Sequence, residues 1–202
     1  MKYYKPFLSV LSIIFLLSSC DDKEIPPIDI NEVPKKFFNI QNGSKLTYVN
    51  VNDTNNETDY FVANYYNTYV NPDISNNEVL YYELVSPTEN ASFLMRIESG
   101  GKALNAFNDR ISMIYKQNDT FTVGALFFYT DAKFLPPVET GDSVQLLDNR
   151  TIGNRIFQSV IRVKLRNNPI FREVYFAEGI GLVGYIRKNG SLVYLKKSTI
   201  LR

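Results

Sequence analysis

The feature that most constrains the fold of this chain is a series of short segments rich in β-branched and aromatic residues, separated by turn-forming residues. Such segments are typical of β-strands. The clearest are residues 78–86, 91–99, 110–116 and 120–129. Beyond residue 19, no stretch shows the sustained 3.6-residue apolar period of an amphipathic helix. The sequence therefore predicts an all-β fold: one antiparallel domain of about nine to eleven strands, either a sandwich or a strongly curved half-barrel.

Turn signals divide these segments into hairpins. Gly100-Gly101 and Asn118-Asp119 each fit a two-residue hairpin turn. Asn189-Gly190 predicts a type I′ turn in the last hairpin, because both residue types accept the positive φ that this turn requires. The Asn-rich segments 53–59 and 71–77 are interpreted as loops.

The first twenty residues have the pattern of a lipoprotein signal peptide. Lys2 and Lys5 precede an apolar run over residues 7–17, which is shorter than the roughly 20 residues that cross a bilayer. Leu17-Ser18-Ser19-Cys20 resembles a bacterial lipobox, in which small residues flank the cleavage site and the cysteine takes a diacylglycerol. We predict removal of residues 1–19 and lipidation of Cys20. The alternatives are an ordinary cleavable signal and an uncleaved anchor helix.

The segment after the lipid site is interpreted as a tether over residues 20–36, followed by the β domain at 37–202. The adjacent Pro26 and Pro27 stiffen this segment toward polyproline II, at about 3.1 Å per residue. A dozen such residues would hold the domain some 40 Å from its anchor. The alternative is an edge strand, against which the two prolines argue.

Three further segments combine aromatic and β-branched residues with glycine. Residues 36–48 contain Phe37-Phe38 and Asn42-Gly43-Ser44, residues 153–163 read GNRIFQSVIRV, and residues 175–185 read YFAEGIGLVGY. These segments resemble the shared strands of Bacteroidetes-type lipoproteins of unknown function. The resemblance implies an exported β domain with no known activity. The acidic cluster at 21–24 resembles the surface-export signal of that group, which implies the outer membrane and display at its surface. The alternative is the inner membrane, because an aspartate directly after the cysteine, here Asp21, resembles the retention signal of enteric bacteria.

The missing residue types exclude most catalytic chemistry. The chain has no histidine, and its only cysteine is the lipidation site, so it lacks Ser-His-Asp and Cys-His constellations and the usual zinc sites. We expect a non-enzymatic protein without a cofactor and without a nucleic-acid partner. One enzymatic alternative is a carboxylate-dependent glycan hydrolase that uses two of the strand residues Glu83, Glu98 and Glu173.

A weak calcium pattern occurs in the first Asn-rich segment. Asp53, Asn55, Glu57 and Asp59 place oxygen ligands at alternate positions, as calcium loops do. The segment lacks the central glycine and the bidentate glutamate at the twelfth position of such a loop. We therefore favour a solvated polar loop over a metal site.

Charge is distributed unevenly along the chain. Residues 20–149 contain nine Lys/Arg and nineteen Asp/Glu, whereas residues 150–202 contain eleven and two. Strand alternation places Arg162, Lys164 and Arg166 on a solvent-facing side. They predict a basic patch for an anionic lipid, an acidic glycan or an acidic envelope protein. The patch is extended, if the last strands are neighbours, by Arg172, Arg187, Lys196 and Lys197. The alternative is neutralisation by acidic strands of the first part.

Together these patterns predict a lipoprotein anchored to a membrane of the cell envelope, with a binding or structural β domain. The alternative is a half-barrel that binds a small apolar ligand or a glycan. Aromatic clusters at residues 65–69, 81–82 and 127–129 place rings on both faces of the sheet, and one set is available to stack on sugars.

Overall fold

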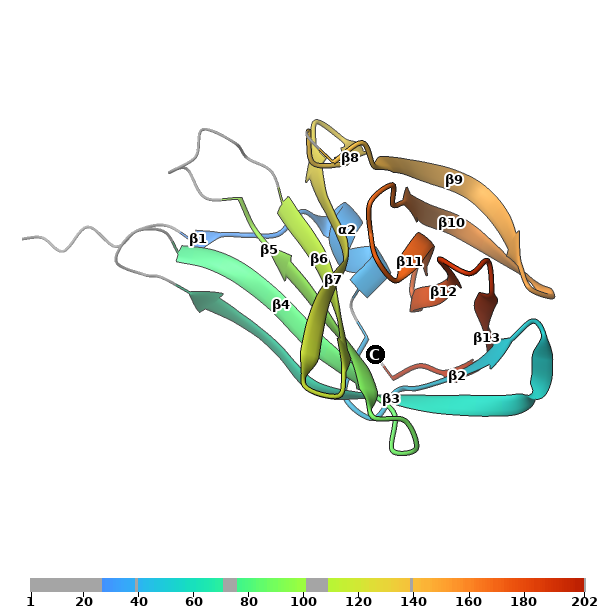
Figure 1. The fold of residues 1–202 in the computed structure, drawn as a ribbon. Helices are drawn as coiled ribbons and strands as arrows, with labels where there is room; N and C mark the ends of the chain where they lie inside the picture. Colours follow the sequence, from blue (N-terminus) through green and yellow to red (C-terminus); the bar gives the residue numbers. More distant parts are fainter. Residues whose placement is uncertain (1–26, 39, 71–75, 101–108, 139, 202) are drawn as a thin grey trace, which may run out of the picture.

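The computed structural model describes residues 27–38, 40–70, 76–100, 109–138 and 140–201 (Figure 1). Within these residues thirteen strands form one sheet, accompanied by the helix α2 (Glu32–Phe38). The strands are β1 (Pro27–Ile28), β2 (Lys45–Asn50), β3 (Asp53–Val70), β4 (Asn76–Val85), β5 (Ala91–Glu98), β6 (Asp109–Gln117), β7 (Thr120–Thr130), β8 (Lys133–Leu135), β9 (Ser143–Ile152), β10 (Arg155–Lys164), β11 (Phe171–Ala177), β12 (Gly181–Arg187) and β13 (Leu192–Thr199). The predicted all-β, antiparallel fold class is confirmed.

The sheet is continuous and strongly curved. Its order is β8-β7-β6-β5-β4-β3-β2-β13-β12-β11-β10-β9, with β1 added in parallel beside β4. The two ends of this order, β8 and β9, contact each other, so the sheet nearly closes on itself (Figure 1). Of the two expected architectures, this is the half-barrel. Thirteen strands exceed the expected nine to eleven because β1 and β8 have only two and three residues, too few to show an alternating pattern.

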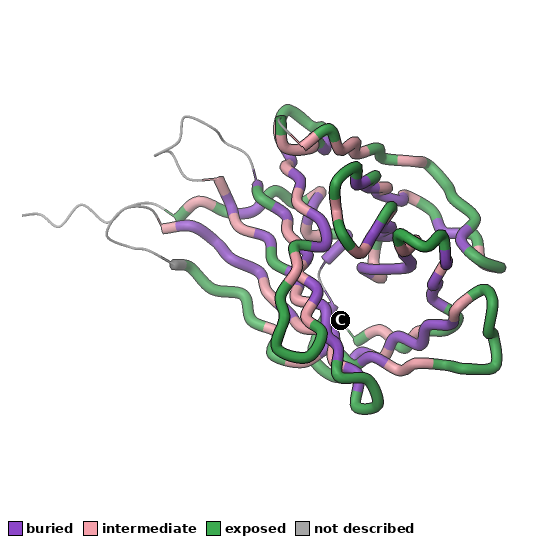
Figure 2. Tube along the Cα trace, in the orientation of Figure 1, coloured by how far each residue is buried: buried purple, intermediate pink, exposed green. Residues whose placement is uncertain are grey.

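Aromatic rings from strands β5 and β6 meet rings from β11 and β12 in the interior of the curved sheet, where Figure 2 shows the buried residues. Phe93 on β5 lies 5.5 Å from Tyr185 on β12 and 6.4 Å from Phe171 on β11, between ring centroids. Tyr115 on β6 also contacts Phe171, at 5.4 Å. Because the chain has no tryptophan, phenylalanine and tyrosine supply the bulk of this core.

Helix α2 packs into the concave side of the sheet. The ring centroid of Phe38 lies 5.1 Å from that of Phe176 on β11 and 6.5 Å from that of Phe127 on β7. The helix therefore contacts core residues of both β7 and β11. This helix was not predicted, because its seven residues give only two turns, too few to establish a period. No helix among the described residues is long and apolar enough to cross a membrane.

The domain begins earlier than predicted. Residues 27–36, assigned to the tether, are packed on the sheet: β1 pairs with Asn76 and Asn77 at the end of β4, and Ile30 is only 2% exposed. The edge-strand alternative is correct here, because Pro27 is the first residue of its strand, where a missing N–H is tolerated. Residues 1–26, with Cys20, lie outside the described part of the chain.

The turn predictions have mixed outcomes. Asn118-Asp119 joins β6 to β7 as a two-residue turn, as predicted. The Gly100-Gly101 turn is wrong, because β5 ends at Glu98 and β6 begins only at Asp109; Gly101 itself lies outside the described residues.

The last hairpin turns at Asn189-Gly190, but the type I′ assignment is wrong. Only Gly190 has positive φ (85°), and its N–H donates to the carbonyl of Arg187. The N–H of Arg187 donates to the carbonyl of Ser191, so the loop has three residues, with glycine at the left-handed position.

The segment 53–59 is also corrected, because it forms the first part of strand β3 and is not a loop. Glu57 pairs with Val49, and Asp59 with Thr47, across the β2–β3 ladder. Residues 53–57 are exposed on a hairpin that projects from the sheet (Figure 1). Their polarity therefore results from contact with solvent and does not indicate a turn.

Candidate anion-binding site

Strand β10 positions the predicted basic patch. Ile161 and Val163 are buried in the core. Lys164, on the opposite face of the strand, is exposed, as the two-residue period of a strand predicts. The pattern fails before this point, because Ser159 has a φ of 47° and interrupts the alternation. Val160, which strict alternation would place on the same face as Arg162 and Lys164, is consequently buried together with Ile161.

Arg162 does not contribute a free charge to the patch. Its Nε and Nη2 donate to the carboxylate of Glu173 on β11, at 2.8 Å and 2.9 Å, and the hydroxyl of Tyr175 donates to the same carboxylate. Burial acts to raise the pKa of Glu173, but these hydrogen bonds outweigh it and hold the pKa below its usual value. Burial and the bond to Glu173 raise the pKa of Tyr175 to about 12. Arg162, Glu173 and Tyr175 therefore form a hydrogen-bonded cluster in which the charges of Arg162 and Glu173 neutralise each other.

Three of the four residues proposed to extend the patch are also engaged elsewhere. Lys196 and Lys197 both form ion pairs with Glu57 of β3, at 2.9 Å and 2.7 Å. The half-buried Arg187 lies over the ring of Tyr185, 5.8 Å from its centroid. For Lys196 and Lys197, the alternative to a basic patch is therefore correct, because an acidic residue of strand β3 neutralises both side chains.

The remaining cations converge on one hollow of about 440 Å³, which we call the basic cleft. It is lined by Gly141, Ser143, Lys164, Leu165, Arg166, Arg172, Glu173 and Lys188. Glu173 is its only carboxylate and is already bonded to Arg162. The cations of the basic cleft are Lys164, Arg166, Arg172 and Lys188. In the described part of the chain, no carboxylate lies within ion-pair distance of these four side chains. The cleft therefore carries an excess of exposed positive charge.

Sequence reasoning found three of these four cations and missed Lys188. Lys188 follows β12, and its Nζ donates to the carbonyl of Arg166 at 3.1 Å. This neighbourhood depends on the hydrogen bond from the Lys188 N–H to the Ile170 carbonyl, next to the β11–β12 ladder. No local pattern in the sequence reveals that pairing; the only usable signal is the excess of Lys and Arg after residue 150.

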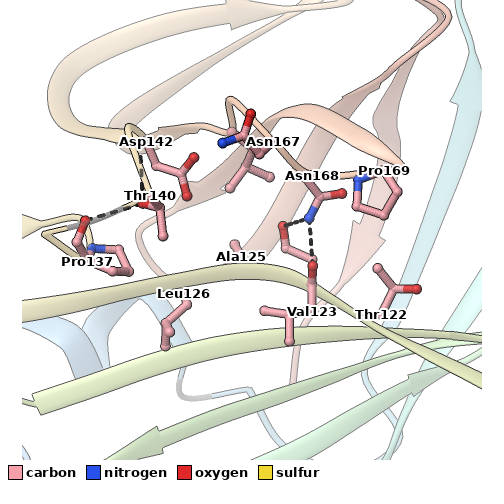
Figure 3. A pocket seen from close by; sticks show the side chains of 12 residues that line it. Thr122, Val123, Ala125, Leu126, Pro137, Thr140, Asp142, Asn167, Asn168 and Pro169 are labelled. Atoms are coloured by element: carbon pink, nitrogen blue, oxygen red, sulfur yellow. Dashed lines mark hydrogen bonds between the residues drawn. The ribbon is translucent and has the colours of Figure 1, made fainter.

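A second hollow of about 370 Å³, the apolar pocket, lies beside the cleft (Figure 3). It is lined by Thr122, Val123, Gly124, Ala125, Leu126, Pro137, Thr140, Asp142, Leu165, Asn167, Asn168 and Pro169. It exists because β8 pairs with β7 only from Phe128 onward, which leaves the earlier edge of β7 uncovered. The Asn168 amide donates to the carbonyls of Val123 and Gly124 on that edge, as Figure 3 shows.

The predicted calcium ligands do not gather around one point. They lie along β3, where side chains two positions apart are about 7 Å from each other. Asp59 binds Lys45 at 2.7 Å and accepts from Thr47 at 2.6 Å, and Glu57 binds two lysines. Among the described residues, no group of three or more His, Cys, Asp or Glu side chains could hold a metal ion.

The carboxylates considered for hydrolysis each have their own partners. Glu83 accepts from Ser92 at 2.8 Å, and Glu98 pairs with Arg96 at 3.0 Å. Of the aromatic clusters, Tyr66 stacks on Tyr81 with centroids 4.8 Å apart, and Tyr66 is 44% exposed. This stacked pair lies outside the two hollows described above.

The segments 36–48, 153–163 and 175–185 are adjacent in the fold. Gly179 and Gly181 have φ values of 73° and 85°, and the Gly179 N–H donates to the Lys36 carbonyl at 2.7 Å. A Cβ on Gly181 would lie 2.9 Å from the hydroxyl of Tyr82, so the backbone of β12 approaches this side chain closely. Comparison of the whole chain with protein-family models, curated proteins and solved structures gives no match.

Proposed function

We propose that this protein is a cell-envelope lipoprotein, anchored through lipid on Cys20, whose β domain binds an anionic group in the basic cleft without catalysing a reaction. The observation that carries the binding role is the convergence of four exposed cations on a hollow whose only carboxylate is already neutralised. In water each cation at about 4 Å contributes about 1 kcal/mol of Coulomb energy. Four such groups around one anion therefore outweigh the isolated lysines of an ordinary surface.

The anchoring part of the proposal rests on the sequence. Lys2, Lys5 and the short apolar run lead to the lipobox-like Leu17-Ser18-Ser19-Cys20. Two or three acyl chains provide stable anchoring, whereas one chain is marginal. The resemblance to Bacteroidetes-type lipoproteins supports the outer membrane, with the domain displayed at its surface. The basic cleft would then face anions of the envelope or its surroundings.

Two matched double variants of the full lipidated chain, held in uncharged detergent, test the binding role. Lys164→Gln/Arg172→Gln removes two charges from the cleft, and Lys196→Gln/Lys197→Gln removes two charges that already pair with Glu57. We expect the cleft variant to bind pyrophosphate at least about tenfold more weakly than wild type, a loss of about 1.4 kcal/mol. The control should stay within about twofold.

Calorimetric titration at about 20 mM and about 150 mM salt provides the readout. Binding should weaken at the higher salt, because exposed charges are screened over about 8 Å. If both variants lose affinity equally, total charge and not the cleft accounts for binding, and the proposal fails. Absence of pyrophosphate binding to wild type at low salt would have the same consequence.

A further inference from the structure

The basic cleft and the apolar pocket lie on the two sides of one chain segment. Thr140 and Asp142 line the apolar pocket, whereas Gly141 and Ser143 line the basic cleft. Leu165 lines both hollows. Alternate residues of this segment therefore line opposite hollows. Only the thickness of one chain therefore separates a cationic hollow from an apolar one.

The crossing point between the hollows is covered by the side chain of a cation. Gly141 has a φ of 68° and no side chain of its own, which leaves room for Arg166. A Cβ placed there would lie 3.0 Å from Cδ and 3.3 Å from Nη1 of Arg166, so the arginine side chain packs across the glycine and forms the surface between the two hollows. The crossing segment is held in place by a hydrogen bond from the Arg166 N–H to Oδ1 of Asp142, at 2.8 Å.

The polar groups of the apolar pocket are largely satisfied within the protein. Oδ1 of Asn168 accepts from the N–H groups of Ile170 and Phe171, and its amide donates to β7. Thr140 donates to the Pro137 carbonyl and accepts from the Asp142 N–H. The hydrogen-bonding groups of Asn168 and Thr140 therefore already have partners, and most of the surface that the pocket exposes is carbon. The carboxylate of Asp142 in the same lining disfavours a negatively charged head in this pocket.

We propose that the ligand of this site is a monomeric anion with a single unbranched alkyl chain, whose charged head lies in the basic cleft and whose chain passes over the Arg166 side chain, beside Gly141, into the apolar pocket. This inference rests on the proposed anion binding and adds the ligand class. A volume of about 370 Å³ lies within the range of small-molecule pockets. Each methylene buried there raises affinity about fourfold, the equivalent of 0.8 kcal/mol. Alkyl phosphates and fatty-acid carboxylates share this chemistry.

A series of methyl, butyl and octyl phosphate, each below its micelle concentration, tests the inference on the full lipidated chain. We expect affinity to rise about two- to fourfold for each added methylene until the pocket is filled. Octanol, which has the chain but no charge, should bind at least about tenfold more weakly than octyl phosphate. The cleft variant Lys164→Gln/Arg172→Gln should weaken all three phosphates by the same factor, because the head is common to them.

A bulky substitution in the pocket separates the chain from the head. Asn167 is exposed and lines the apolar pocket, so Asn167→Trp should abolish the gain from butyl to octyl phosphate while leaving methyl phosphate unchanged. Asn55→Trp, on exposed β3, is the matched control and should keep the full gain. The wild-type chain-length series stands by itself if the tryptophan variant does not fold.

The two proposals fail in different ways. Equal affinity for methyl and octyl phosphate, together with the loss in the cleft variant, would overturn the alkyl-chain ligand and leave anion binding standing. Equal affinity for octanol and octyl phosphate would also overturn it, because the pocket would then act without the cleft. If the cleft variant binds every phosphate as wild type does, the proposed function itself fails.

Discussion

Gly190 is a residue whose backbone conformation, and not its packing, determines the last hairpin. It has a φ of 85°, and a Cβ added to it would meet nothing within 4 Å. Its neighbour Asn189 contributes through its side chain, whose oxygen accepts from the Ser191 N–H at 3.0 Å. The turn therefore requires a left-handed residue at one position and not at two.

Gly190→Val should lower the free energy of unfolding by about 1–2 kcal/mol, because a β-branched residue is strained in the left-handed region. Urea unfolding followed by circular dichroism measures this cost. Gly190→Asn is the matched control and should recover most of the loss, since asparagine tolerates positive φ. Because the site is open, no steric clash contributes; equal stability of the valine variant and wild type would contradict the role assigned to this glycine.

Single residues also show where sequence reasoning about the site stops. Strand alternation assigns Lys164 to the outer face correctly, because that period is local. It cannot reveal that Arg162 is neutralised, since Glu173 lies eleven positions away on the next strand. Nor can it place Gly141 beside Arg166, a contact that depends on the pairing of β9 with β10.

Among the elements, the segment from β1 to α2 is held to the sheet by two buried carboxylates. Glu78 on β4 accepts from the Ile30 N–H at 2.7 Å and binds Lys35 at 2.9 Å. Asp109 on β6 is 2% exposed and accepts from the backbone and side-chain amides of Asn31, at 2.9 Å and 2.7 Å. Burial raises the pKa of Asp109 above its usual value, against the opposing effect of these hydrogen bonds.

This shift predicts how stability depends on pH. A carboxyl whose pKa is higher in the folded than in the unfolded state contributes stability below its unfolded pKa, and that stability is lost as pH rises through the folded pKa. From about pH 4 to about pH 7, wild type should therefore lose stability relative to Asp109→Asn, which does not titrate at this position.

Urea unfolding at each pH gives the difference in free energy between the two proteins. Glu32→Gln, on the exposed face of α2, is the control and should follow wild type throughout. A constant difference between wild type and Asp109→Asn over this range would show that Asp109 has the same pKa in both states, contrary to the burial described here.

The strands that sequence reasoning found and those it missed differ in where their side chains lie. Strands β4 to β7 were predicted to within two residues at each end, because one face is buried in the core and the other is not. The start of β3 was missed because it projects into solvent and is polar on both faces. Helix α2 and β1 were missed because each depends on burial against the sheet, which a short segment does not encode locally.

For the whole molecule, the curvature of the sheet explains where the candidate site lies. The sheet nearly closes between β8 and β9, and the part of β7 that β8 leaves uncovered becomes a wall of the apolar pocket. The basic cleft lies next to it, where β10 ends and β11 begins. The apolar pocket therefore follows from incomplete closure of the sheet.

The proposed anchor would hold this domain close to the membrane. Because the packed domain begins at Pro27, only residues 20–26 separate it from the lipid under the proposed cleavage. At no more than about 3.6 Å per residue, these seven residues reach about 25 Å. The spacing of some 40 Å expected for a longer tether is therefore too large.

Membrane fractionation of Cys20→Ala is the most direct test of the central claim, that lipid on Cys20 tethers this binding domain to the envelope. Wild type and the control Ser18→Ala, which keeps a small residue in the lipobox, should stay with membranes after salt and carbonate washes. Cys20→Ala should move to the soluble fraction, because it cannot accept the acyl chains that give stable anchoring. Retention of Cys20→Ala in the washed membranes would contradict the claim.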